Sequence, residues 1–172
     1  IDGPGGAAWE IALLPDAIPE VFFDGPVERE PNGRMIQPFR AIDDYGVVSG
    51  GGQLAIDMGA LQRVHGLAID PDPRDPIAID LPMSITGDRS DFTGKVVEDF
   101  CKHPWVGLPV QFTLTVTDAA GQDGTAEALS MDRLPGRRFF EPVAAALIEQ
   151  RRDLLWARAN GARVVQILRA VT

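Results

Sequence analysis

Apolar and polar residues alternate along many short stretches of this chain. The clearest stretch covers residues 109–118, in which apolar residues alternate with Gln and Thr. A period of two residues with one polar side is typical of a strand that buries one face, and the outward threonines suit a pleated surface. The same pattern predicts nine strands, over residues 8–14, 20–23, 35–43, 47–58, 63–69, 76–81, 89–95, 109–118 and 124–131.

Turn-forming residues separate these stretches. The chain holds 18 Gly and 14 Pro, most of them before residue 137. Residues 70–76 predict a loop because they include three prolines, which cannot donate to a strand ladder. Residues 118–124 predict a hairpin loop, and the glycines at residues 50–52 predict a bulge or bend. Short strands divided by turns predict a mainly β fold, an Ig-like or fibronectin-like β-sandwich over residues 1–136.

One stretch inside this β region has a helical period. Apolar residues recur there at i, i+1, i+4 and i+5, namely Val96, Val97, Phe100 and Cys101. This spacing predicts a short helical crossover that ends before Pro104. A strand that continues through residue 97 is the alternative.

The character of the chain changes near residue 137. From Val143 to Trp156 the sequence favours helix without a breaker, and Pro142 suits a first helical turn. Asn160 is a candidate N-cap for a second helix. The apolar residues of that helix fall on one stripe, formed by Val164, Ile167, Leu168 and Val171. Residues 137–172 are therefore predicted to form an α-helical hairpin, the start of a helical tail.

These helices carry apolar stripes that another surface must cover. The stripes either pack against the sandwich or pair with another copy, so a homodimer through the C-terminal helices is one expected arrangement. The second stripe is still periodic at the chain end, and the first residue is Ile1 rather than Met. Both features predict a piece of a longer protein, in which no signal peptide is visible.

The overall charge argues against two classes of partner. Lys and Arg number 16 and Asp and Glu number 25, which gives a net charge of −9. Such an acidic chain is not expected to bind nucleic acid or an anionic membrane surface. The longest apolar run, residues 143–148, is far shorter than the ~20 residues that a membrane-spanning helix needs. Membrane contact is therefore expected only through regions outside this chain.

Residue types that support catalysis or metal binding are few and scattered. Cys101 is the one cysteine, so no internal disulfide can form. Cys101, His103 and His65 lack the paired spacing of a zinc site, and nothing near Cys101 and His103 marks a nucleophile pair. The sequence has no phosphate-binding glycine loop, nucleophile elbow or zinc-protease motif. We predict no metal, no cofactor and no enzymatic activity.

Four residues are candidates for binding. Asp43 and Asp44 form one of several carboxylate clusters in loops, which turn chemistry explains, although paired carboxylates also serve calcium binding or hydrolysis. Trp105 follows His103 in a loop, and an exposed Trp can stack on a sugar or anchor a partner. A Trp beside a crossover more often fills the end of a core, and we predict that role for Trp105.

Four segments of the chain resemble one bacterial family. They are residues 92–100 (FTGKVVEDF), 103–110 (HPWVGLPV), 117–124 (TDAAGQDG) and 145–152 (AALIEQRR). With the DDYGV turn at residues 43–47, they resemble the uncharacterised family called domain of unknown function four-one-seven-five over residues 40–152. Cys101 departs from the family pattern, in which a small polar residue is expected at this position.

The resemblance implies a cellular setting but no chemistry. Members are large proteins of Gram-negative bacteria with membrane spans near the N-terminus, an extracytoplasmic region and a long helical tail. This chain would then be a fragment of a membrane-anchored protein on the periplasmic side of the inner membrane. The family has no established activity, so the resemblance transfers no catalytic residue.

Three functions are weighed against each other. The preferred one is a non-catalytic Ig-like periplasmic module that docks or spaces proteins in the cell envelope, with an unknown envelope protein as its partner. The alternative is a glycan- or small-ligand-binding module that uses Trp105 and nearby carboxylates, and it requires an exposed indole. A hydrolase is the third, and its carboxylates or metal ligands would have to converge.

Overall fold

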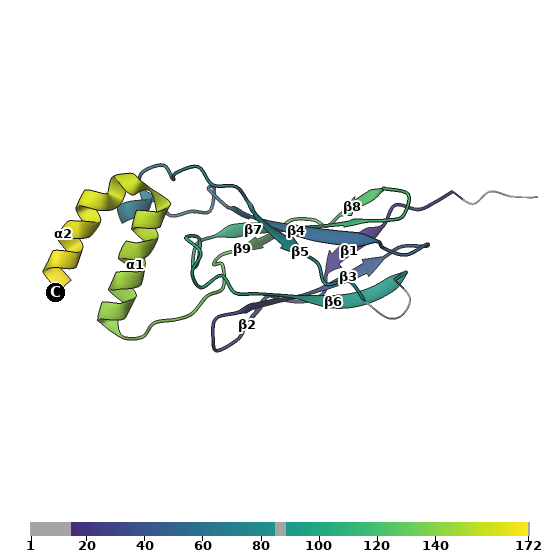
Figure 1. Cartoon of the computed structure of the whole chain (residues 1–172), viewed down its shortest axis with the longest axis horizontal. Coiled ribbons are helices and arrows are strands. Elements are labelled where there is room, and N and C mark those ends of the chain that lie inside the picture. Colours follow the sequence, from purple (N-terminus) through teal and green to yellow (C-terminus); the bar gives the residue numbers. More distant parts are fainter. Residues whose placement is uncertain (1–14, 85–88, 172) are drawn as a thin grey trace, which may run out of the picture.

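The structure is a computed structural model that describes residues 15–84 and 89–171 (Figure 1). Two antiparallel sheets face each other, and two helices lie at one end of them. This arrangement confirms the predicted mainly β sandwich followed by a C-terminal helical pair. The first sheet contains β1 (Glu20–Phe23), β2 (Glu28–Arg29), β3 (Met35–Ile42) and β6 (Asp91–Glu98). The second contains β4 (Ser49–Ile56), β5 (Ile77–Asp80), β7 (Val110–Thr117), β8 (Asp123–Thr125) and β9 (Leu129–Met131).

Each sheet is organised around one long strand. In the first sheet, β6 pairs with the whole length of β3, and β1 and β2 both pair with β3 as well. In the second sheet, β4 pairs with the whole length of β7, β5 lies beyond β4, and β8 and β9 pair with opposite ends of β7. The chain crosses between the sheets from β3 to β4, from β5 to β6 and from β6 to β7.

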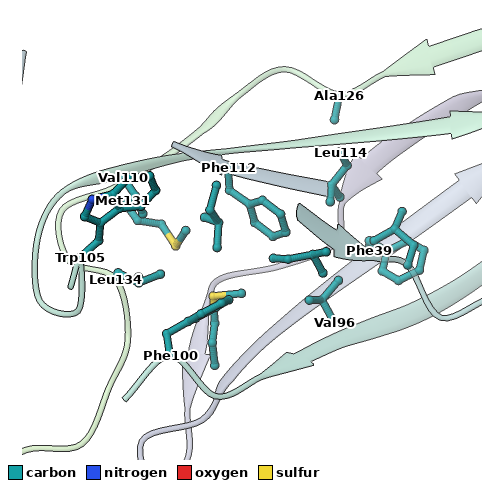
Figure 2. Packing of buried hydrophobic residues seen from close by; sticks show 14 of the residues in the cluster. Phe39, Val96, Phe100, Trp105, Val110, Phe112, Leu114, Ala126, Met131 and Leu134 are labelled. Carbon is teal, nitrogen blue, oxygen red and sulfur yellow. The ribbon is translucent and has the colours of Figure 1, made fainter. Parts of the chain in front are cut away.

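The inward rows of the strands form one apolar core (Figure 2). In β7 the residues alternate between buried and partly exposed positions, as the sequence pattern predicts. Phe112 packs against Phe23 with ring centroids 5.4 Å apart, and Phe39 meets Phe92 edge-on at 6.1 Å. Burying a side chain of this size stabilises the fold by about 1.5–3 kcal/mol. The core therefore provides the main stabilisation of the sandwich.

The glycines at residues 50–52 do not form the predicted bulge. The pairing of β4 with β7 runs without interruption from Ser49 opposite Thr117 to Ile56 opposite Val110. A Cβ on Gly52 would lie 2.7 Å from the Phe112 ring, so glycine leaves space there for the aromatic side chain. Gly52 therefore makes room for a core side chain, and the pairing of the strand continues without a bulge.

Three other predictions of elements need correction. Residues 63–69 do not form a strand but surround a short 3-10 helix, η1 (His65–Leu67). The predicted helical crossover at residues 96–101 is wrong because β6 continues to Glu98, with Val96 buried and Val97 exposed as in any strand. The predicted strand 124–131 is divided into β8 and β9, and the two-residue strand β2 was not predicted. The predicted strand 8–14 lies outside the described residues.

The helical segment begins as predicted. Helix α1 (Pro142–Trp156) has Pro in its first turn, and the Glu141 carboxylate accepts hydrogen bonds from the backbone N–H groups of Val143 and Ala144. A short 3-10 turn, η2 (Arg158–Asn160), leads into α2 (Gly161–Val171). In the described part of the chain, every helix is too short or too polar to cross a membrane.

Candidate functional site

The helices are fixed to the sandwich through the long loop between β4 and β5. The Asp153 carboxylate of α1 is buried beside this loop, and the Arg163 guanidinium donates to it at 2.7 Å. Gly66 of η1 lies so close that a Cβ there would be 2.2 Å from the Asp153 carboxyl carbon. The Asn160 amide donates to the Gly66 carbonyl at 2.8 Å and to the Asp153 carbonyl at 2.7 Å. Asn160 thus ties the helices to the loop, a role that the predicted N-cap did not include.

Trp156 provides the second part of this attachment. The side chain is 2% exposed, and the indole Nε1 donates to the Ile69 carbonyl at 2.9 Å. The backbone N–H of Asp72 donates to the Trp156 carbonyl at 2.8 Å, and the Asp72 carboxylate accepts from the Arg158 N–H at 3.0 Å. We call this set of contacts the joint, defined by Gly66, Ile69, Asp72, Asp153, Trp156, Asn160 and Arg163.

An open groove runs between α1 and the nearby end of the sandwich. It consists of two adjoining cavities of about 330 and 590 Å³ that share Gly107, Arg133 and Glu149 as lining residues. One face of α1 lines the groove through Ala145, Ile148, Glu149 and Arg152, which recur at i, i+3, i+4 and i+7. The joint sets the position of this helix face, so it also sets the width of the groove.

The smaller cavity is strongly basic. Arg29, Arg133, Arg137 and Arg138 line it, whereas Glu149 is the one acidic residue in its lining. Within residues 15–84 and 89–171, the recorded ion pairs involve none of these four arginines. The guanidinium of Arg29 donates to the Gly136 carbonyl at 3.3 Å, and that of Arg137 lies 5.7 Å from the centre of the Phe139 ring. The apolar part of the lining comes from Val106, Leu134, Pro135, Phe139 and Ile148.

The larger cavity has a balanced charge. Arg133 and Arg152 line it together with Asp132 and Glu149, and His65 also lines it. His65 has φ of 52°, the one positive φ among the described non-glycine residues. This cavity continues the groove from Arg133, which lines both cavities, toward the loop that carries η1.

Trp105 lies in the core and not on the surface. It is 4% exposed and lies among Val110, Met131 and Leu134 (Figure 2). This confirms the prediction that Trp105 fills the end of the core. The indole presents no open face on which a sugar ring could stack, so the ligand-binding alternative loses the residue on which it depended.

His103 and Cys101 bond to different partners. The His103 Nδ1 accepts from the Trp105 N–H at 3.2 Å, and burial together with the nearby Arg74 charge lowers the pKa of His103. The Cys101 thiol accepts from the Arg137 N–H at 3.2 Å, and burial, followed by the contact with Asp99, raises the pKa of Cys101. A raised pKa disfavours the thiolate that a nucleophile would need.

Asp43 and Asp44 lie at the end of the sandwich away from the helices, in the turn that follows β3. The buried Asp43 carboxylate accepts from the Tyr45 N–H at 3.3 Å, whereas Asp44 is exposed. In the neighbouring turn the Asp118 carboxylate accepts from the backbone and the side-chain amide of Gln122. Burial raises the pKa of Asp16, and the charges of these three carboxylates raise it further. In the described residues, no three His, Cys, Asp or Glu side chains are placed to hold a metal ion.

A family model matches residues 1–172, and its description is "Domain of unknown function (DUF4175)". The chain belongs to the DUF4175 family. No curated protein matches it. Membership confirms the resemblance carried by the sequence motifs, and the match extends over this whole DUF4175 chain. The family description assigns no activity, so the roles of residues in this DUF4175 chain depend on its own geometry.

Sequence reasoning missed the groove of this DUF4175 chain, although one signal for it was present. Residues 133–172 contain eight Arg against three acidic residues, a net charge of +5. Residues 1–132 contain eight basic and 22 acidic residues, a net charge of −14. The overall charge of −9 hides this division. A comparison of the two parts would have drawn attention to the arginines after β9.

Proposed function

We propose that this DUF4175 chain is a non-catalytic module that docks a protein partner in the cell envelope. The groove beside α1 carries the proposal, because it combines four arginines outside the recorded ion pairs with an apolar lining. Arginine and apolar side chains together are typical of protein-binding surfaces. The proposed location is the periplasmic side of the inner membrane, which the family resemblance supports.

The rigid joint favours docking over a purely passive spacing role. A spacer needs only a fixed length, whereas a binding surface gains affinity when its walls are held in place before the partner arrives. Asp153, Asn160 and Trp156 hold α1 in place through buried and partly buried hydrogen bonds to the β4–β5 loop and to α2. Spacing of neighbouring regions is the competing proposal for the same module.

Capture from a bacterial envelope extract tests the docking function. The immobilised wild-type chain should retain a specific protein, and Gly66→Ala should lose it, because the added Cβ would displace Asp153 and shift α1. Gly51→Ala is the matched control, since its Cβ would meet its nearest atom at an ordinary 3.5 Å. Equal capture by wild type and Gly66→Ala, or no capture by the wild type, would contradict docking at the groove and favour a spacer.

A homodimer through the helices is a second proposed association. Apolar side chains on α1 and α2 remain partly exposed, namely Val143, Leu147, Leu154 and Val165. Pairing with a second copy would cover them. Light scattering over a range of concentrations tests this association. A mass that rises to twice that of the chain supports it, and a constant monomer mass contradicts it.

A further inference from the structure

We infer that the groove binds an extended acidic peptide segment of the partner, with its carboxylates in the smaller cavity and the rest of the segment along the larger one. This inference rests on the proposed docking function and names the chemistry of the partner. Charge, shape and the apolar lining of the groove each contribute to the argument.

Charge selects an anionic ligand at one end of the groove. In the smaller cavity, Arg29 comes from β2 and Arg133, Arg137 and Arg138 come from the segment before α1, while Glu149 is the opposing charge from α1. Guanidinium groups form paired hydrogen bonds with carboxylates. The larger cavity adds Arg152 and Asp132, which balance each other. The attraction for an anion is therefore concentrated in the smaller cavity.

The acidic end of the sandwich does not cancel this attraction. Asp43, Asp44 and Asp118 lie at the opposite ends of β3 and β7 from the helices. An eight-residue strand such as β7 spans about 26 Å. At physiological salt, charges separated by more than about 8 Å are largely screened from each other. The four arginines therefore act on a nearby ligand without strong interference from these carboxylates.

The length of the groove selects an extended segment over a small ion. The α1 residues that line it run from Ala145 to Arg152, a distance of about 10 Å along the helix axis. An extended peptide covers that length with about three residues. A single phosphate or carboxylate would occupy only the arginine-rich cavity and leave the larger one empty.

The apolar lining favours a segment in which acidic residues alternate with apolar ones. Successive side chains of an extended peptide point to opposite sides. Carboxylates on one side can then meet the arginines, while the other side contacts Val106, Phe139 and Ile148. This pattern accounts for the two kinds of side chain that line the same cavity.

A fluorescence anisotropy titration tests the inference. The probe is a short fluorescein-labelled peptide that alternates Glu with Leu, and the control probe replaces each Glu with Gln. The wild-type chain should bind the Glu probe saturably, and the double variant Arg133→Gln/Arg138→Gln should bind it about tenfold more weakly. Arg169→Gln is the matched control because this exposed arginine of α2 does not line the groove. All three arginines are exposed, and circular dichroism checks that each variant remains folded.

Two competing ligands separate a peptide groove from other anion sites. Inorganic phosphate should displace the Glu probe only at much higher concentration than the unlabelled peptide. The chain should not co-sediment with phosphatidylglycerol vesicles. Equal binding of the Gln probe, an unchanged affinity of the double variant, efficient displacement by phosphate, or vesicle binding that depends on Arg133 and Arg138 would each overturn the inference.

The two proposals fail in different ways. If the capture experiment retains a partner equally on the wild type and on Arg133→Gln/Arg138→Gln while Gly66→Ala loses it, docking stands and the acidic-peptide assignment is wrong. If the wild type retains no partner, the docking function itself fails, whatever the short peptide does.

Discussion

Different kinds of contact hold together the interior of the sandwich and the joint between the helices and the β4–β5 loop. The sandwich interior consists of apolar side chains that pack from two sheets, with Phe39 and Phe112 fully buried. The joint is smaller, and although Trp156 belongs to the same apolar cluster, directed hydrogen bonds from Asn160, Trp156 and Arg163 provide most of its contacts. Apolar packing tolerates small shifts of its members, whereas hydrogen bonds require defined positions.

This difference indicates separate tasks for the two regions. The sandwich provides a stable body, and the joint sets the orientation of α1 relative to that body. A change in the core should therefore unfold the whole chain, whereas a change in the joint should release the helices and leave the strands intact. The following predictions test this separation.

The largest effect is expected from Phe112→Ala. The side chain is fully buried and contacts Phe23, so its removal leaves a cavity between the two sheets. We expect a loss of about 3–5 kcal/mol in the free energy of unfolding, measured by urea denaturation. Strand and helix signals should disappear in one transition. Separate transitions for the sandwich and the helices would show that the core does not support the joint.

Gly66→Ala should produce a local effect of intermediate size. The new Cβ would overlap the Asp153 carboxyl group, and relief of this overlap should cost about 1–3 kcal/mol. Hydrogen exchange should increase in α1 and α2 and remain unchanged in β3 and β7. The control Gly51→Ala, with an ordinary contact at 3.5 Å, should alter neither region. Faster exchange throughout the strands would contradict independent tasks for the two regions.

Trp156→Phe should weaken the joint by less than Gly66→Ala does. The substitution keeps an aromatic ring but removes the Nε1 donor to the Ile69 carbonyl, a bond worth about 1 kcal/mol. Exchange of α1 amides should rise by a smaller factor than in Gly66→Ala. An unchanged exchange rate would mean that Trp156 acts only through packing.

The smallest effect is a dependence on pH from His103, which lies at the border of the two regions. Burial and the Arg74 charge lower its pKa in the folded chain, so the neutral form is favoured on folding. This contribution is fully present above the unfolded pKa of about 6.5 and is lost as the pH falls through the lowered folded pKa. The variant His103→Asn should therefore lose less unfolding free energy than the wild type on acidification through this window. Arg74→Gln should reduce the loss in part, and an identical pH profile for both variants and wild type would contradict the assignment.

Sequence patterns predicted several strands closely, most clearly β3 and β7, in which buried residues recur at every second position. Strands β1, β3, β4 and β7 lie within one or two residues of their predicted limits because one face of each is covered by the opposite sheet. The prediction failed at residues 63–69, where the backbone forms a loop that contacts the helices and does not pair with a sheet. It also failed at residues 96–101, because pairing with β3 outweighed a short helical period.

Local sequence patterns could not predict the groove. Its lining comes from β2, the β4–β5 loop, the loop before β7, the segment after β9 and one face of α1, and these segments extend from residue 29 to residue 152. Only the folded chain brings Arg29 beside Arg137. Trp105 was correctly placed in the core because Trp side chains are highly buried on average, although the crossover expected beside it does not form. The roles of Gly66 and Asn160 depend on their contact in the folded chain. A periodic pattern in the sequence carries no information about such a contact.

The distance along the chain between the two halves of the joint has a consequence for the order of assembly. Asn160 and Gly66 are 94 residues apart, and β9 ends at Met131, before the first residue of α1. A ribosome releases about 5–20 residues per second from the N-terminus onward. The sandwich strands thus leave the ribosome before the helices are synthesised. Until then the β4–β5 loop is exposed to solvent and lacks its contacts with α1 and α2. We therefore expect the joint to form last during synthesis.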